Sequence, residues 1–147
     1  MQLANPMMRF LAQRVEGLQK AVIVLHFRGR SGRNFDLPVG YRLVDGTITL
    51  LSNSRWRHNF RGGADLEVTY RGRRQPARAT LIEDPEMVAD LYRRLSEDLE
   101  PSQVARRLGF RINLDRHPTR QEWQEAIQRE RMSIVELEPT DPESPVL

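Results

Sequence analysis

The hydrophobic positions in the first half of the chain follow patterns typical of β-strands. Residues 21–27 form a continuous apolar and largely β-branched run, which predicts a strand buried on both faces. Residues 35–44 and 47–52 predict two more strands. These two strands are joined by Asp45-Gly46, a pair that favours the positive φ angles of a tight hairpin turn.

A second hairpin is expected around Arg71-Gly72. On both sides of this pair an apolar residue stands at every second position, as in strands with one buried face. The alternating residues are Leu66, Val68 and Tyr70 before the turn, and Ala77, Ala79 and Leu81 after it. Residues 131–137 predict a sixth strand near the end of the chain.

Helical patterns precede and follow these strands. Residues 6–19 carry apolar side chains at helical spacing and predict an amphipathic helix. Asp84-Pro85-Glu86 predicts the start of another helix, with an aspartate cap, proline at the first helical position and an acid in the first turn. The apolar stripe of that helix is expected to comprise Met87, Val88, Leu91, Tyr92, Leu95 and Leu99.

Two further helices are expected after this one. Residues 101–109 begin with Pro-Ser and end with Leu-Gly, which predicts a short helix that stops at the glycine. Thr119 and Glu122 have the spacing of a capping box and predict the start of another. Its buried face is expected to present Trp123, Ala126 and Ile127.

These elements fit one domain of the α+β class. A chain of 147 residues can bury a single core. Strands with peripheral helices favour a closed or nearly closed barrel over a doubly wound sheet. We assign residues 1–137 to this domain. Residues 138–147 are acidic and contain three prolines, a composition that predicts a disordered tail.

Composition argues against several classes of protein and of functional site. The chain is 39% hydrophobic and 29% charged, and it has no apolar run of the roughly 18 residues that a membrane-spanning helix requires. Without the pattern of a secretory signal, we expect a cytoplasmic protein. The sequence has no cysteine and only three scattered histidines, so neither a thiol nucleophile nor a metal site is expected.

The distribution of charge predicts a binding site for an anion. Lys20 is the only lysine among 23 basic residues, so all the others are arginine, whose planar guanidinium matches phosphate and carboxylate groups. The 20 acidic residues offset most of this charge, which leaves a net charge of +3. Two stretches, 28–33 and 55–61, carry three arginines each and no acid. An anion is expected to bind there.

The segment 28–33 reads Arg-Gly-Arg-Ser-Gly-Arg and lies between two expected strands. Its glycines can turn backbone N–H groups toward a ligand, Ser31 adds a hydroxyl, and Arg28, Arg30 and Arg33 can donate charge-assisted hydrogen bonds to phosphate oxygens. The alternative is a solvated hairpin turn whose basic residues aid solubility. The segment is neither a Walker loop nor a dinucleotide-binding fingerprint.

A polar loop with one tryptophan follows the expected strand 47–52. Residues 52–63 combine Trp56 with arginines and amides, and such a loop can hold a ring system by stacking while polar groups bind its edges. The alternative is that Trp56 packs in the core and that His58 is an ordinary surface residue. For His26 and His117 we expect structural roles.

Together these features resemble the flavin-binding split β-barrel superfamily, and within it the deazaflavin (coenzyme F420)-dependent nitroreductase-like and pyridoxamine-phosphate-oxidase-like branch. The resemblance extends from about residue 22 to residue 83. It depends on Arg-Gly-Arg-Ser-Gly at 28–32, Pro38 six residues after Gly32, the Asp45-Gly46 turn, and Trp56 followed by Asn59. It implies a six- to seven-stranded antiparallel split β-barrel with peripheral helices.

The resemblance also implies a cofactor, FMN or F420, and a set of residues that bind it. The cofactor's phosphate would lie on Arg28, Arg30, Ser31, Gly32 and Arg33. Its ring would lie beside Pro38 and Val39, and Ser52, Trp56 and Asn59 would close the pocket. The implied protein is a homodimeric oxidoreductase that transfers a hydride between the cofactor and a small organic substrate, with the chemistry supplied by the cofactor.

Two other functions remain open at this point. The same barrel could be a non-catalytic carrier of a flavin, a haem-related pigment or a fatty acid, because a fold does not fix a function. The arginines could also bind nucleic acid, which predicts a steep dependence of affinity on salt. The small net charge and the few aromatic residues argue against a nucleic-acid partner.

Overall fold

The computed structural model describes residues 22–108 and 115–140. The described residues form two compact units. The first contains the described residues up to Leu50, residues 55–81, and the residues from Val135 onward; the second contains residues 51–54 and the described part of 82–134. The helix expected at 6–19 lies outside the described residues, as do residues 141–147 of the expected tail. The assignment of residues 1–137 to one domain therefore stays a prediction.

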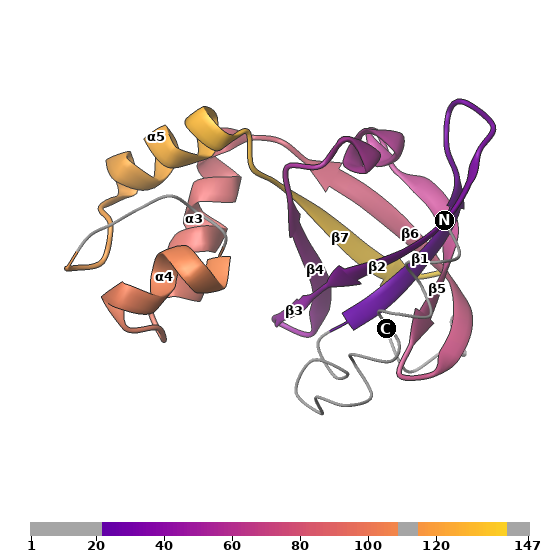
Figure 1. Ribbon diagram of the computed structural model, residues 1–147, viewed down its shortest axis with the longest axis horizontal. Helices are drawn as coiled ribbons and strands as arrows, with labels where there is room; N and C mark the ends of the chain where they lie inside the picture. The colour runs from indigo at the N-terminus through magenta and orange to yellow at the C-terminus, as the bar shows by residue number, and fades with distance from the viewer. Residues whose placement is uncertain (1–21, 109–114, 141–147) are drawn as a thin grey trace. The chain divides into compact units, whose positions relative to one another are not determined.

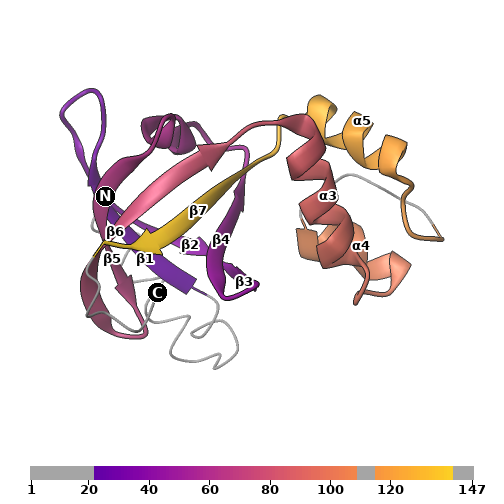
Figure 2. The ribbon, with the colours of Figure 1, turned by 180° about the vertical axis from the view of Figure 1, so that it is seen from behind.

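Seven strands form one curled antiparallel sheet (Figure 1). The strands are β1 (Val22–Arg28), β2 (Asn34–Gly40), β3 (Arg42–Val44), β4 (Thr47–Ser52), β5 (Ala64–Tyr70), β6 (Arg73–Ile82) and β7 (Ser133–Pro139), and a 3-10 helix, η1 (Arg55–Phe60), lies between β4 and β5. The strand order is β2-β1-β5-β6-β7-β4-β3. Figure 2 shows β6 and β7 side by side from the other side of the sheet.

The strand order explains why the sheet curls. Its first and last strands, β2 and β3, are consecutive in the chain and are separated only by Tyr41. One residue spans less than about 4 Å, so the two ends of the sheet must approach each other where β2 continues into β3. Tyr41 is buried, and its ring lies 5.4 Å from that of Tyr70 in an edge-to-face arrangement. The expected strand 35–44 is thus wrong in one respect, because it is interrupted at Tyr41.

Both predicted hairpins are present. The turn between β3 and β4 has φ angles of 51° at Asp45 and 82° at Gly46, and the turn between β5 and β6 has 51° at Arg71 and 80° at Gly72. Positive φ at both central residues is the geometry whose twist matches that of antiparallel strands.

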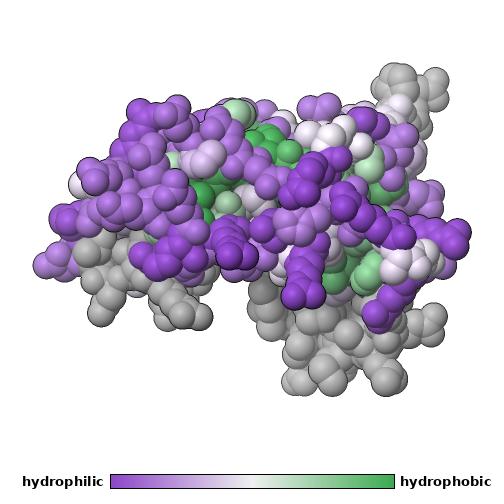
Figure 3. All heavy atoms as spheres, turned by 90° about the horizontal axis from the view of Figure 1, so that it is seen from above, coloured by the Kyte–Doolittle hydropathy of each residue, from purple (hydrophilic) through white to green (hydrophobic). Residues whose placement is uncertain are grey.

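The first unit has its own hydrophobic core. Alternate residues of β1 and of the second hairpin point into it, and Ile23, Leu25 and Val68 have no exposed surface. Burying side chains of this size contributes about 1.5–3 kcal/mol each before entropy is subtracted. Figure 3 shows the outer surface from one direction, where hydrophilic residues predominate and hydrophobic ones are visible only in small areas.

The second unit contains three helices, α3 (Pro85–Ser96), α4 (Pro101–Leu108) and α5 (Arg120–Glu130). All three were predicted close to these bounds. Its core combines α3 residues Val88 and Tyr92 with α5 residues Trp123 and Ile127. The expected stripe on α3 is wrong at Met87, which is 54% exposed, and Leu99 lies beyond the end of the helix. Asp84 stands at the N-cap position of α3 but makes no side-chain capping hydrogen bond.

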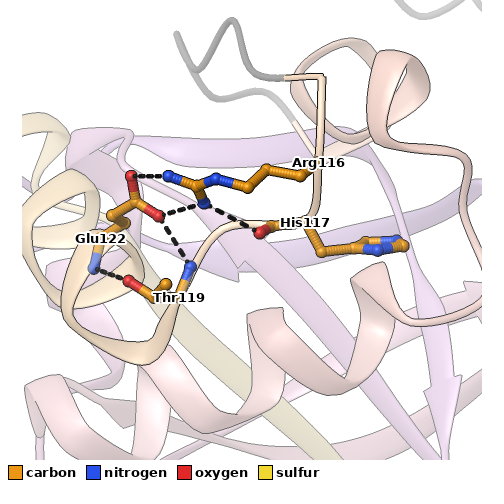
Figure 4. Close-up of polar contacts among 4 residues, drawn as sticks. All are labelled: Arg116, His117, Thr119 and Glu122. Carbon is orange, nitrogen blue, oxygen red and sulfur yellow. Dashed lines mark hydrogen bonds and ion pairs between the residues drawn. The ribbon is translucent and has the colours of Figure 1, made fainter.

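The capping box at the start of α5 is present (Figure 4). The Glu122 amide donates to Thr119 Oγ1 at 3.2 Å, and the Thr119 amide donates to Glu122 Oε1 at 2.9 Å. Arg116 adds a two-pronged contact to the same carboxylate, with N–O distances of 2.7 and 3.1 Å. The guanidinium of Arg116, together with the Thr119 amide, lowers the pKa of Glu122 to about 2.

The expected α+β class, with a seven-stranded antiparallel sheet of split-barrel type and helices, is confirmed. The last strand begins at Ser133 rather than at Arg131 and includes Glu138 and Pro139, which we had assigned to the tail. Among the described residues, no helix has the length and apolar composition needed to cross a membrane.

Candidate functional site

The turn between β1 and β2 is closed by its own backbone. The Gly29 amide donates to the Arg33 carbonyl at 2.8 Å, and the Gly32 amide donates to the Gly29 carbonyl at 2.9 Å. Gly32 has φ of 86°, which residues with a side chain rarely adopt. Both glycine N–H groups therefore maintain the turn, and the positive charge available to a ligand lies on the arginine side chains.

The three arginines of this turn, Arg28, Arg30 and Arg33, make no contact with a carboxylate of residues 22–108 or 115–140. Arg28 Nε donates to the Gly32 carbonyl at 3.0 Å, and the Arg33 guanidinium lies over the Phe35 ring, 5.3 Å from its centroid. Within the described part of the chain, none of the three guanidinium groups forms an ion pair with Asp or Glu. The turn is therefore a concentration of positive charge.

The structure brings this turn to η1. The Arg30 amide donates to Asn59 Oδ1 at 3.2 Å, and Arg30 Nη2 donates to the His58 carbonyl at 3.0 Å. The topology accounts for the approach, because β1 and β5 are antiparallel neighbours and the end of β1 therefore lies beside the start of β5, just after η1. The two arginine-containing segments singled out in the sequence thus form one site.

Asn59 connects the parts of this site. Its Nδ2 donates to the Trp56 carbonyl at 2.9 Å, while its Oδ1 accepts the Arg30 amide. Trp56 is partly buried against the core and contacts the Phe60 ring edge-to-face, with centroids 6.1 Å apart. Trp56 therefore packs against the core, as the core-packing alternative expects, but the residue as a whole is only partly buried.

The second arginine-rich stretch contributes less surface charge than its composition indicates. Arg57 is buried, with 7% of its surface exposed. Arg61 Nη2 lies 3.0 Å from His58 Nδ1, and since a guanidinium can only donate, His58 accepts through Nδ1. Arg61 and His58 therefore belong to the site. Both lie in the stretch 55–61, where an anion is expected, but they are not among the cofactor-binding residues that the resemblance implies.

Pro38 and Val39 lie on β2, away from the turn. In the register with β1, Pro38 pairs with Val24 and Val39 with Ile23, whereas the turn begins at the Arg28–Asn34 pair. Pro38 follows Asn34 by four positions along the strand, which corresponds to about 13 Å at ~3.3 Å per residue. Val39 packs against the core, so the side chain of Pro38 is on the opposite face of the strand.

Ser52 belongs to the second unit. Its Oγ accepts the Ser54 amide at 3.0 Å, and its carbonyl accepts a hydrogen bond from Ser133 Oγ at 3.1 Å. Its assignment to the cofactor pocket stays a prediction. Ser31 lies in the turn and is exposed.

The two histidines expected to be structural have ordered contacts. His117 Nε2 lies 2.7 Å from the Leu99 carbonyl. His26 contacts Asp36 through one ring nitrogen and Thr69 through the other, each at 2.7 Å. The contact set of His26 was not predicted, because it depends on the register of three strands. Among the described residues, no cluster of three His, Asp or Glu side chains could hold a metal ion.

Comparisons with known protein families and with curated proteins find no match for this chain. The functional argument therefore depends on the geometry of the site.

Proposed function

We propose that this protein binds FMN or a deazaflavin through the cofactor's phosphate at the turn 28–33, and that it transfers a hydride between the cofactor and a small organic acceptor. The observation that carries the proposal is the attachment of the turn to η1. Arg30 contacts Asn59 and His58, so guanidinium groups that have no carboxylate partner among the described residues lie next to a partly buried tryptophan. Such a combination suits a ligand with an anionic tail and a planar ring.

The donor set fits a phosphate group. Guanidinium groups bind phosphate oxygens in a two-pronged manner, and an ionised acceptor makes such hydrogen bonds about twice as strong as neutral ones. Arg28, Arg30 and Arg33 would bind the phosphate, with the Ser31 hydroxyl as a further donor. A bound flavin or deazaflavin supplies the hydride chemistry.

The remaining residues orient the ligand. Trp56 offers a partly buried aromatic side chain, and Asn59 holds η1 against the turn, so the anion-binding and ring-binding parts keep a fixed separation. The ring would extend from the turn along β2, beside the side chain of Pro38 and the backbone of Val39. We include pairing as a homodimer in the proposal, which implies that dilution to monomers releases the cofactor.

Titration of the purified protein with FMN and with the deazaflavin coenzyme tests the proposal. We expect one of the two to bind with micromolar or tighter affinity, which corresponds to about −8 kcal/mol, and to show a changed absorption spectrum. Anaerobic reduction of the bound cofactor should be followed by its reoxidation on addition of a small organic acceptor.

Two other outcomes have distinct meanings. Tight binding with no reoxidation by any acceptor would support a non-catalytic carrier, which is the second function compatible with the site. Failure of both cofactors to bind at up to millimolar concentration would contradict the proposal.

A further inference from the structure

A row of chemically complementary side chains crosses the outer face of the sheet on three neighbouring strands, one of which is distant from the other two in the sequence. Asp36 is on β2, His26 on β1 and Thr69 on β5. His26 Nδ1 lies 2.7 Å from Asp36 Oδ1, and His26 Nε2 lies 2.7 Å from Thr69 Oγ1. The imidazole thus joins a carboxylate to a hydroxyl.

The carboxylate fixes the direction of the first hydrogen bond, and the charge state of the imidazole sets the direction of the second. An ionised carboxylate can only accept, so Nδ1 of His26 carries a proton and donates to Asp36. In the neutral imidazole Nε2 is then an acceptor, and the Thr69 hydroxyl donates to it. The His26 side chain is 14% exposed, so the ring is held in this orientation, whereas that of Asp36 is 47% exposed.

A positive charge lies on the next strand. In the pairing of β5 with β6, Thr69 is directly opposite Arg74, and residues paired in this way have Cβ atoms about 4.5–5.5 Å apart. The Arg74 guanidinium contacts Glu67 Oε1 at 3.0 Å through Nε and at 2.9 Å through Nη2. Glu67 precedes Thr69 by two residues on the same face, so this ion pair keeps the guanidinium over the sheet.

We propose that Asp36, His26, Thr69 and Arg74 form an acyl-transfer site in which the Thr69 hydroxyl is the nucleophile and the substrate is an ester. A hydroxyl that donates to an imidazole, itself oriented by a carboxylate, is the arrangement by which proteins activate weak oxygen nucleophiles. This site shares no residue with the proposed cofactor site, and its reaction needs no cofactor.

The proposed reaction has two balanced steps. In the first, Thr69 Oγ1 bonds to the carbonyl carbon of the ester while its proton moves to His26 Nε2; the C–O bond to the leaving group then breaks, and that oxygen receives the proton from His26. In the second, water attacks the acyl-threonine, again giving its proton to His26, and Thr69 regains a proton as the carboxylic acid departs. We assign the stabilisation of the negative carbonyl oxygen in each step to Arg74, which is opposite Thr69 on β6 and paired with Glu67.

Reaction with p-nitrophenyl acetate, without added cofactor, tests this site. We expect release of nitrophenol and transfer of one acetyl group, found by peptide mass spectrometry on Thr69. Thr69→Val should lower the rate by about 100-fold or more, in keeping with the loss of a general-base-assisted step. Thr69→Ser should retain activity, and Thr80→Val, a change at an exposed threonine of β6, should leave the rate unchanged.

The contacts of His26 with Asp36 and Thr69 also link three strands, so variants of His26 and Asp36 can lose stability. Their test therefore needs a measurement that a loss of stability would not change. We expect added imidazole to restore part of the rate of His26→Ala, and Asp36→Glu to retain more activity than Asp36→Asn at equal helix and strand content. Absence of acetyl-Thr69 in wild-type protein quenched with acid during turnover, or an unchanged rate in a folded Thr69→Val variant, would overturn the proposal. The mass measurement decides the question even if Thr69→Val does not fold.

Discussion

Gly32 determines the shape of the arginine-rich turn. Its φ of 86° lets its amide donate to the Gly29 carbonyl and its own carbonyl accept from Arg28 Nε. A Cβ at this position would lie 3.6 Å from Arg28 Nη2, which is ordinary contact, so space alone would permit a larger residue. The cost of replacing Gly32 is therefore conformational.

Gly32→Ala should destabilise the protein by about 1–2 kcal/mol, the cost of the left-handed conformation for a residue with a Cβ. Urea unfolding measures this change. The matched control is Ser31→Ala at the neighbouring exposed position, which should alter stability by less than about 0.5 kcal/mol. Equal stability of Gly32→Ala and the wild type would mean that the turn has a different conformation.

Single residues differ in how far the sequence reveals their roles. Asp45-Gly46 and Arg71-Gly72 were predicted correctly, because a two-residue hairpin turn requires positive φ and few residue types allow it. His26 was assigned only a general structural role. Its partners Asp36 and Thr69 follow it by 10 and 43 residues, and only the strand register brings them within hydrogen-bond distance.

At the scale of elements, the start of α5 is held by a charged network that involves Arg116, Thr119 and Glu122 (Figure 4). Contacts to Glu122 lower its pKa from the usual 4.5 to about 2. A carboxylate whose pKa is lowered by folding stabilises the folded state above its unfolded pKa and loses that effect as the pH falls through its folded pKa.

Glu122→Gln should therefore lower the free energy of unfolding by a constant amount above about pH 5. The difference in this free energy between the variant and the wild type should shrink between pH 4.5 and 2. Urea midpoints measured at pH 7, 5 and 3 give this difference. Glu125→Gln removes a charge from an exposed position of the same helix and should show a smaller effect at pH 7. A difference that is independent of pH across this range would contradict the role of the carboxylate.

Elements were easier to predict than their interruptions. The spacing of Thr119 and Glu122 predicts the start of α5, because a capping box is a local motif with a fixed spacing. The break at Tyr41 was missed because the apolar pattern of 35–44 continues through it, and only the requirement to join both ends of the sheet explains it. Met87 matches helical periodicity yet is exposed, since periodicity does not show which positions of a helix other elements cover.

At the scale of the whole chain, the strand order creates the candidate cofactor site. The turn 28–33 and η1 are far apart in the sequence, and the antiparallel pairing of β1 with β5 brings them together. The composition of each segment could be recognised from the sequence, but their contact could not. The described residues also form two units with separate cores, which the sequence analysis did not distinguish.

The central claim is that the arginines of the turn bind the phosphate of a flavin or deazaflavin. A matched pair of double variants tests it by titration with both cofactors. Arg30→Ala with Arg33→Ala removes two charges from the turn, and Arg73→Ala with Arg120→Ala removes two exposed charges elsewhere. Circular dichroism should show that both variants retain the fold.

We predict that the turn variant binds its cofactor about 100-fold more weakly than the wild type, because about 1.4 kcal/mol lost per arginine corresponds to a tenfold change each. The control variant should bind within about threefold of the wild type, as expected for distant charges screened by salt. Wild-type affinity in the folded turn variant would contradict the claim.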